Sequence, residues 1–418
     1  MASGAVRTGQ TAKYLHLFGH DVRVVSADDQ PLRGGLPLEL PRENVVYTPW
    51  IGARIASSKE GWALSGATAA EVPASEPHAS PTSGAAVAAW HALRWLQRHA
   101  LYVPDRQIGW YPYALRAALS IVHSQPIDLI YASAWPVTSL LVAASASSMR
   151  GIPWVAELRD LWSGHHYREL HGWQRDIDLR LERRVLNSSA ALVTVSQPLA
   201  DALARTFRPP VRVILNGFDE PDTAPPSQGD PNEVLRVVYL GWLYGGKRDP
   251  TPFFQALRSL RAQGKPIRAE FYGEDASLVQ RLVRANAVED MVEVLGPVPH
   301  AESLATQAAA DVLLLLMYNA PGEEGVLTGK LFEYMGARRP ILAVGAPEGA
   351  LSDLLRERRL GFVSSDPAAI AAQLSAWIDQ KRRTGRIQTH PSSAVADFKR
   401  SVQVEKLSEL LCSLAPRR

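Results

Sequence analysis

The chain has 418 residues, and a single hydrophobic core stops growing at roughly 250–300 residues, so we expect two domains. Its composition, with 46% hydrophobic and 21% charged residues, excludes wholesale disorder, a coiled coil and a collagen-like fibre. The 45 basic residues nearly balance the 42 acidic ones, so no nucleic-acid partner is indicated. The single cysteine, Cys412, excludes a disulfide framework and a cysteine-rich zinc site.

The beginning of the chain departs from the usual pattern of an α/β domain, which opens with a buried strand, a Gly-containing turn and a helix. Here Gly4 and Gly9 lead at once into the helical pattern of 11–18, with no strand before it. We therefore predict that the first strand of the first domain is missing. Either the start is late or trimmed, or the first unit is a variant.

Short apolar runs that favour buried strands follow along the chain, separated by stretches with helical spacing. These strands are predicted at 21–27, 128–133, 153–158, 191–195, 211–215, 235–240, 267–272, 311–317, 341–344 and 361–363. Helices are predicted at 137–150, 174–187, 250–263 and 367–381, the last with Asp366 as N-cap and Pro367 in its first turn. This alternation is typical of parallel, doubly wound sheets, so the predicted fold class is α/β.

Two stretches interrupt the alternation and suggest the domain organisation. Residues 219–234 are rich in proline and acidic residues and poor in apolar ones, which is typical of a linker. Residues 56–85 are rich in Ala, Ser, Pro and Gly and predict a long mobile loop. We predict a first domain at 1–218, a second at 235–394, and a C-terminal helix within 395–418 that packs toward the first domain.

Nothing in the sequence predicts a segment that spans a membrane. No apolar run approaches the ~20 residues that cross a bilayer, and the first residues carry no apolar signal-peptide core. We expect a cytoplasmic enzyme, either free or at the inner face of the cell membrane. Aromatic side chains alternate with arginines over 90–116; this suits peripheral membrane contact, and equally a helix that packs its aromatic groups inward.

The first candidate site follows the strand predicted at 235–240. Glycines at 241, 245 and 246 allow close approach of the backbone to a ligand, and Lys247 with Arg248 brings positive charge. The turn precedes a helix, and ligands of such sheets bind at the carboxyl ends of strands and on helix N-termini. This turn suits a phosphate, although a strand–turn–helix junction with solvated cations has the same residues.

The second candidate site follows the strand predicted at 311–317. Thr328 is placed to cap a helix from Lys330 to Ala337, and the backbone N–H groups of its first turn form an anion site together with Lys330. Glu333 lies on the same face, three residues further on. This arrangement suits a pyrophosphate and a ribose diol; a surface Lys–Glu pair is the alternative.

Other strand-end turns contribute weaker candidates. Gly273 follows the strand at 267–272, while Gly296 and Val298 follow an apolar run at 292–295, where backbone groups suit a base or a sugar. In the first half, Arg159 and Asp160 end the strand at 153–158 and are expected to face a cleft between the domains. The nearby histidines, including His165, do not match a standard metal-ligand set, so no metal site is predicted.

Taken together, these residues resemble the retaining GT-B-fold glycosyltransferases of the family-four type, the bacterial glycosyl transferases of group 1. The likeness covers nearly the whole chain. It is carried in the first half by segments at 104–110, 128–133, 151–162, 195–196 and 214–219, and in the second half by 241–247, 272–273, 295–296, 330–334 and 340–342.

The resemblance implies two Rossmann-like domains facing a cleft, with a nucleotide-diphosphate sugar of UDP or GDP type bound mainly to the second domain. It implies that Lys247, Lys330 and Glu333 are catalytic, with no cofactor and no metal ion. The residues implied to bind the nucleotide sugar are Gly241, Arg248, Gly273, Gly296, Val298, Glu324, Thr328, Gly329 and Leu331. The residues implied on the acceptor side are Gly4, Arg159, Asp160 and His165.

Two positions depart from the family pattern. The first glutamate of its paired-glutamate motif falls at Gly325, with Glu323 and Glu324 out of register, and the arginine after the first glycine of the loop is Trp242. The implied reaction is transfer to a lipid-linked, oligosaccharide or small-molecule hydroxyl acceptor in cell-surface polysaccharide or glycoconjugate synthesis, or in natural-product glycosylation. Two alternatives stay open: a nucleotide-sugar epimerase of the same fold, and a non-catalytic nucleotide-sugar-binding protein.

Overall fold

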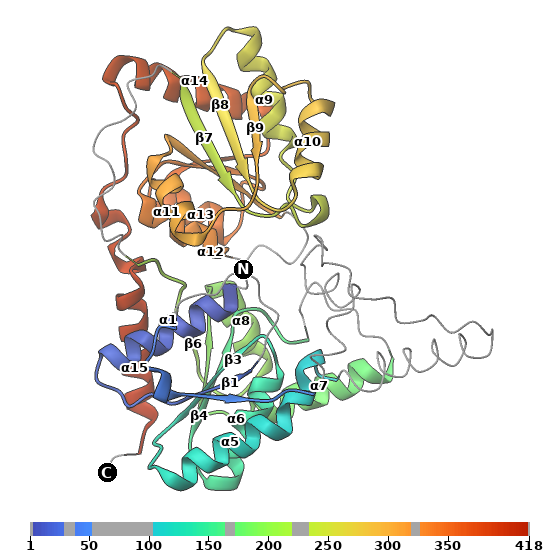
Figure 1. Ribbon diagram of the computed structural model, residues 1–418, viewed down its shortest axis with the longest axis vertical. Helices are drawn as coiled ribbons and strands as arrows, with labels where there is room; N and C mark the ends of the chain where they lie inside the picture. The colour runs from blue at the N-terminus through green and yellow to red at the C-terminus, as the bar shows by residue number, and fades with distance from the viewer. Residues whose placement is uncertain are drawn as a thin grey trace, which may run out of the picture. The chain divides into compact units, whose positions relative to one another are not determined.

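The computed structural model describes residues 3–28, 38–51, 103–163, 172–219, 234–318 and 327–416. The chain divides into two compact units (Figure 1). Unit 1 comprises 1–195, 199–214 and 404–418, and unit 2 comprises 196–198 and 215–403. The predicted loop at 56–85 and most of the predicted linker lie outside the described residues.

Unit 1 holds two parallel sheets. A sheet of two strands pairs β1 with β2, and a sheet of four has the order β3-β4-β5-β6. The strands are β1 (Val24–Ala27), β2 (Val45–Thr48), β3 (Ile130–Ala134), β4 (Trp154–Leu158), β5 (Ala191–Thr194) and β6 (Val211–Val213). Every residue of β4 and β5 is buried, which explains why these strands read as continuous apolar runs.

The helices of unit 1 cover these sheets. They are α1 (Ser3–Leu17), α5 (Tyr111–Ser124), α6 (Thr138–Arg150), α7 (Trp173–Leu186), α8 (Gln197–Thr206) and the larger part of α15 (Arg400–Leu414), with short 3-10 helices at Arg42–Asn44 and Arg106–Trp110. Among the described residues no strand precedes α1. All five strands predicted in this half are present, whereas β2, with the sequence Val-Val-Tyr-Thr, was not predicted.

Unit 2 is built on one parallel sheet of six strands in the order β12-β11-β10-β7-β8-β9 (Figure 1). The strands are β7 (Leu235–Leu240), β8 (Ile267–Tyr272), β9 (Val292–Leu295), β10 (Val312–Leu316), β11 (Ile341–Val344) and β12 (Gly361–Ser364). The helices are α9 (Thr251–Ala262), α10 (Ala276–Ala285), α11 (His300–Ala309), α12 (Gly329–Ala337), α13 (Ala350–Glu357) and α14 (Pro367–Thr384), with 3-10 turns at Tyr244–Gly246, Ser392–Ala394 and Ala396–Phe398.

An apolar core lies on each face of this sheet. Helices α9, α10 and α14 supply one core, in which Phe253, Phe254 and Phe271 stack at tilted angles. Helices α12 and α13 supply the other, around Phe332 and Met335. The central strands are therefore covered on both sides, as parallel strands require.

The helix-start signals in unit 2 are confirmed in position. Asp366 caps α14 by accepting hydrogen bonds from the backbone N–H groups of Ala368 and Ala369, and Pro367 opens the helix. Thr328 is the N-cap of α12. Its hydroxyl, however, makes no capping hydrogen bond and is buried without a hydrogen-bond partner among the described residues.

Candidate functional site

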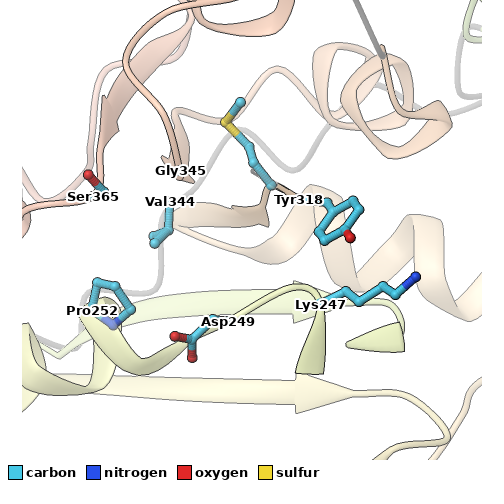
Figure 2. A pocket seen from close by; sticks show the side chains of 8 residues that line it. Lys247, Asp249, Pro252, Tyr318, Val344, Gly345 and Ser365 are labelled. Carbon is cyan, nitrogen blue, oxygen red and sulfur yellow. The ribbon is translucent and has the colours of Figure 1, made fainter. Parts of the chain in front are cut away.

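The order of the strands in unit 2 reverses between β7 and β10. After β7 the chain adds β8 and β9 on one side, and β10, β11 and β12 on the other. Ligands of doubly wound sheets bind at such a point, beyond the carboxyl ends of the strands. A cavity of about 280 Å³ lies there. Its lining residues are Lys247, Asp249, Pro252, Met317, Tyr318, Val344, Gly345 and Ser365 (Figure 2).

The turn after β7 brings Lys247 to this cavity through an unusual backbone. Tyr244, Gly245 and Gly246 all have positive φ angles of 51°, 67° and 96°, a region that glycine enters without steric cost. The carboxylate of Asp275 accepts a hydrogen bond of 2.6 Å from the backbone N–H of Leu243. This bond ties the turn to the start of α10 and so anchors the backbone segment that carries Lys247.

Lys247 lies beside an aromatic ring supplied by the neighbouring strand. Its Nζ is 5.4 Å from the centre of the Tyr318 ring, and Tyr318 follows β10. Figure 2 shows the two side chains next to each other at one end of the cavity. A cation at this distance from an aromatic face is attracted by the quadrupole of the ring. Tyr318 therefore helps to orient the ammonium group.

Arg248 takes a different course from Lys247. Its guanidinium carbon is 4.6 Å from the centre of the Tyr244 ring, and it does not line the cavity. Tyr239, at the end of β7, supports the same turn. Its hydroxyl donates to the carbonyl of Trp242 at 2.9 Å, and burial raises the pKa of Tyr239 to about 12. Tyr239 thus stays protonated and braces the turn from inside.

A second, much smaller cavity adjoins the ends of β7, β8 and β9 and is lined by Gly241, Gly273 and Asp275, among others. A Cβ atom built on Gly273 lies 2.1 Å from the carbonyl oxygen of Gly241. The two strand-end turns are therefore packed so closely that position 273 requires glycine. Gly296, after β9, has open space around its Cβ position, and Val298 is partly buried against the core beside α12.

Helix α12 carries the other predicted residues at its first turns. Lys330 Nζ is 2.9 Å from Glu333 Oε2, which also accepts a hydrogen bond of 3.1 Å from Gln307. Gly329 is the first residue of the helix, and the N–H of Leu331 donates to the carbonyl of Thr328. Neither Lys330 nor Glu333 lines the larger cavity.

Tyr334, on the buried side of α12, connects the helix to the point where the strand order reverses. Its hydroxyl donates to the carbonyl of Leu314 in β10 and accepts from the N–H of Leu240 at the end of β7. Burial raises its pKa well above the usual value for tyrosine. Tyr334 thereby fixes α12 to both strands that flank the reversal.

In unit 1, a buried ion pair lies at the carboxyl end of the four-stranded sheet. Arg7 Nη2 is 2.7 Å from Glu157 Oε1, with both side chains almost inaccessible to water, and the hydroxyl of Ser133 donates to Glu157 Oε2. Burial raises the pKa of Glu157, but the charge of Arg7 and the hydrogen bonds from Arg7 and Ser133 outweigh it, so the pKa lies below the usual value.

Of the residues predicted for the acceptor side, Arg159 makes hydrogen bonds that support the protein's own backbone. The guanidinium of Arg159 donates to the carbonyls of Ala134 and Trp135, at 2.9 and 3.2 Å, and so supports the turn after β3. Asp160 follows β4 and is half-buried, and Gly4 lies in the first turn of α1. Contact of these residues with an acceptor stays a prediction. His165 and Glu324 lie outside the described residues.

The aromatic–basic segment is described from residue 103 onward. Trp110 is buried, and its indole N–H donates to the hydroxyl of Thr48 at 2.7 Å. The Tyr111 hydroxyl bonds with that of Ser145 at 2.8 Å. These two aromatic side chains pack inward, as the second interpretation of this segment expects.

Just before them in the chain, Asp105 accepts hydrogen bonds from the backbone N–H and the hydroxyl of Thr138, at the start of α6.

The structure therefore brings only part of the predicted site together. Of the three residues implied to be catalytic, Lys247 alone lines the larger cavity, and Gly241 with Gly273 lines the smaller one. Sequence reasoning missed Tyr318, Asp249 and Asp275. The common signal is their position: each follows a strand of the sheet, at the edge where parallel strands end together.

Within the described part of the chain, no group of three or more His, Cys, Asp or Glu side chains is placed to hold a metal ion. None of its helices is both long and apolar enough to cross a bilayer.

Solved structures define the class of fold. Sucrose-phosphate synthase from Thermosynechococcus elongatus is 15% identical with a TM-score of 0.61 over 98% of this chain and 92% of that one. A glycosyltransferase from Rickettsia africae is 11% identical with a TM-score of 0.60 over 99% and 96% of the chains. Anabaena HepE, solved in complex with UDP-glucose, is 19% identical with a TM-score of 0.53 over 72% and 82%. The two Rossmann-like units thus form a GT-B fold.

The family follows from the sequence. The model of the glycosyl transferase 4-like domain matches residues 4–217, and that of the glycosyl transferases group 1 matches residues 235–380. The first model alone covers more than half of the 418 residues, so the chain belongs to this family and is a glycosyltransferase that uses a nucleotide-sugar donor. No curated protein matches the sequence significantly.

Proposed function

We propose that this enzyme transfers a sugar, with retention of anomeric configuration, from a nucleotide-diphosphate sugar to a hydroxyl acceptor. The donor binds at the strand reversal of unit 2, with its diphosphate near Lys247 and the first turn of α12. The observation that carries this proposal is the cavity of about 280 Å³, which lies where a doubly wound sheet binds ligands and has an oriented lysine in its wall.

The physical demand of the reaction supports this placement. When the bond between the anomeric carbon and the phosphate oxygen breaks, negative charge grows on the leaving diphosphate. Fixed cations and the N-terminus of a helix stabilise such charge because they are already oriented when it forms. Lys247 is held between the Asp275-anchored turn and the Tyr318 ring, and α12 is fixed by Tyr334. Both elements meet the requirement for prior orientation.

Retention and the route of the proton come from the family resemblance. The acceptor hydroxyl attacks the anomeric carbon on the face that the diphosphate leaves. A new carbon–oxygen bond forms, the bond to the phosphate oxygen breaks, and the hydroxyl proton passes to the leaving diphosphate. Lys330 and Glu333, paired at 2.9 Å in α12, are proposed to bind a phosphate and the ribose diol, respectively.

The donor base and the setting are further parts of the proposal. Because Anabaena HepE was solved with UDP-glucose, uridine diphosphate is the first nucleotide to test and guanosine diphosphate the second. The acceptor is a carbohydrate or lipid-linked hydroxyl in cell-surface polysaccharide or glycoconjugate assembly. No cofactor is proposed beyond the donor itself.

Two measurements test this function. Nucleotide release from a UDP- or GDP-sugar should depend on an added oligosaccharide or lipid acceptor; isomerisation of the sugar without release indicates an epimerase, and tight binding without turnover indicates a binding protein. Lys247→Ala should lower turnover by ~100-fold or more if Lys247 stabilises leaving-group charge. Lys265→Ala is the matched control, because Lys265 lies at the amino end of β8, away from the carboxyl ends where the cavity lies, and pairs with Asp379. Near-normal turnover of Lys247→Ala would remove Lys247 from the mechanism.

A further inference from the structure

Helix α7 of unit 1 carries large apolar side chains that are exposed. Trp173 is 53% exposed and Ile177 is 44% exposed. Arg180 and Arg184 continue the same spacing, so these four side chains follow one another along one side of the helix. We refer to Trp173, Ile177, Arg180 and Arg184 as the α7 face. In Figure 1, α7 is the light green helix that extends to the right of the strands of unit 1.

The exposed charge of this helix is almost entirely positive. Two of its three acidic residues point inward: Asp178 accepts from the indole N–H of Trp162 at 3.0 Å, and Glu182 accepts from the backbone N–H of Ser163 at 3.3 Å. Asp176 is the remaining, exposed acid. Against it stand four exposed arginines: Arg175, Arg180, Arg183 and Arg184.

We propose that the α7 face docks on an anionic lipid surface. Tryptophan and arginine both suit the boundary between water and lipid headgroups, since each combines an apolar body with a polar end. An amphipathic helix with arginines beside exposed Trp and Ile binds such a surface through apolar burial and electrostatic attraction together. Because the carboxylates of Asp178 and Glu182 point inward, their negative charge is kept away from the α7 face, where it would oppose this attraction.

The described part of the aromatic segment around residue 110 does not offer a similar surface. Trp110 is buried and Tyr111 is hydrogen-bonded to Ser145. Among the described residues of unit 1, the α7 face is therefore the better candidate for contact with lipid, and the inference stands independently of the donor and acceptor proposed above.

Co-sedimentation of the full chain with lipid vesicles tests the proposal. We expect binding to vesicles of phosphatidylcholine mixed with phosphatidylglycerol and at least tenfold weaker binding to phosphatidylcholine alone. Raising the salt from about 0.1 M to about 1 M shrinks the Debye length from about 10 Å to about 3 Å, so binding should fall steeply with salt. The intrinsic tryptophan fluorescence of the chain should shift to shorter wavelength on binding, and Trp173→Phe should remove that shift.

Paired variants separate the two contributions. Trp173→Ser with Ile177→Ser should weaken binding to anionic vesicles about tenfold, and Arg180→Gln with Arg184→Gln should weaken it and reduce its salt dependence. The matched controls lie on exposed helical positions of unit 2: Arg281→Gln with Arg284→Gln in α10, and Leu304→Ser in α11. These controls should bind as the wild type does, and all variants should keep their thermal stability, because the changed side chains are exposed.

Three results would overturn the proposal. The first is no binding to anionic vesicles, and the second is binding that the α7 variants leave unchanged. The third is a dimer of the wild type that dissociates in Trp173→Ser with Ile177→Ser, since this assigns the α7 face to a second copy of the chain.

Discussion

At the scale of single residues, Tyr318 determines how Lys247 is presented to the cavity. The ring lies 5.4 Å from the ammonium group, and such a contact stabilises a cation by about 0.5–2 kcal/mol. Tyr318→Leu should therefore lower kcat/KM for the donor by roughly 3- to 10-fold, while Tyr318→Phe, which keeps the ring, should stay close to the wild type. Steady-state kinetics with varied donor measures both. Equal losses in the two variants would show that the hydroxyl, and not the ring, is what matters.

A second residue, His390, makes the stability of unit 2 depend on pH. It is buried, and burial lowers its pKa to about 4, although its contact with the Met335 carbonyl opposes the shift. An unfolded histidine has a pKa of about 6.5, so between pH 6.5 and 4 the unfolded chain binds a proton that the folded chain does not. The contribution of His390 to the free energy of unfolding is therefore complete above pH 6.5. It is lost as the pH falls toward 4, by up to about 3 kcal/mol.

The variant His390→Gln tests this pH dependence. Glutamine does not titrate, so the thermal midpoint of the variant should fall less than that of the wild type between pH 7 and pH 4. Carboxylates titrate in the same range in both proteins, and the comparison cancels them. Identical slopes of midpoint against pH would contradict a buried neutral histidine at this position.

At the scale of elements, the ends of β7 and β8 are packed against each other through two glycine turns. A Cβ atom on Gly273 lies 2.1 Å from the Gly241 carbonyl, whereas one on Gly296 meets nothing within 4 Å. Gly273→Ala should destabilise the protein by about 1–3 kcal/mol, as overpacking does, and Gly296→Ala should change stability by less than about 0.5 kcal/mol. Thermal unfolding measures both, and the reverse order would refute the close packing of the two turns.

Gly273 and Gly296 show which features of the site the sequence predicts and which it does not. Both were predicted to contact the nucleotide because each follows a strand in a family motif. The structure supplies another reason for Gly273, which is the approach of the next strand-end turn. Such long-range contacts cannot be read from local residue types, and for the same reason Asp275 and Tyr318 were missed. Strand positions were predicted well, because buried parallel strands leave a continuous apolar run.

At the scale of the whole molecule, the last residues of the chain complete the core of unit 1. Leu407 is fully buried against β4 and β5, close to Val155 and Val193. Leu407→Ala should cost about 2–5 kcal/mol in unit 1, and Lys406→Ala, at an exposed neighbour, should cost little. Hydrogen exchange followed by mass spectrometry should show faster exchange in β4 and β5 but not in β8. Equal acceleration in both sheets would show that the two units unfold together.

The fold class was predictable from the sequence because strand–helix alternation runs through both predicted domains, on either side of the linker. The separation of unit 1 into sheets of two and four strands was not, since the pairing of β1 with β2 is a contact between two segments that the composition of neither one specifies. Pairing of β7 with β10 and β8 places residues from distant parts of unit 2 at one edge. The site depends on this pairing, which no single segment of the sequence encodes.

The most direct test is calorimetric binding of UDP and GDP, each compared with its monophosphate, to the wild type and to Lys247→Ala. We predict that one of the two diphosphates binds the wild type more tightly than its monophosphate, and that Lys247→Ala weakens diphosphate binding at least tenfold while changing monophosphate binding little. Failure of both diphosphates to bind the wild type, or equal affinity of Lys247→Ala for the diphosphate, would contradict a donor site at the strand reversal of unit 2.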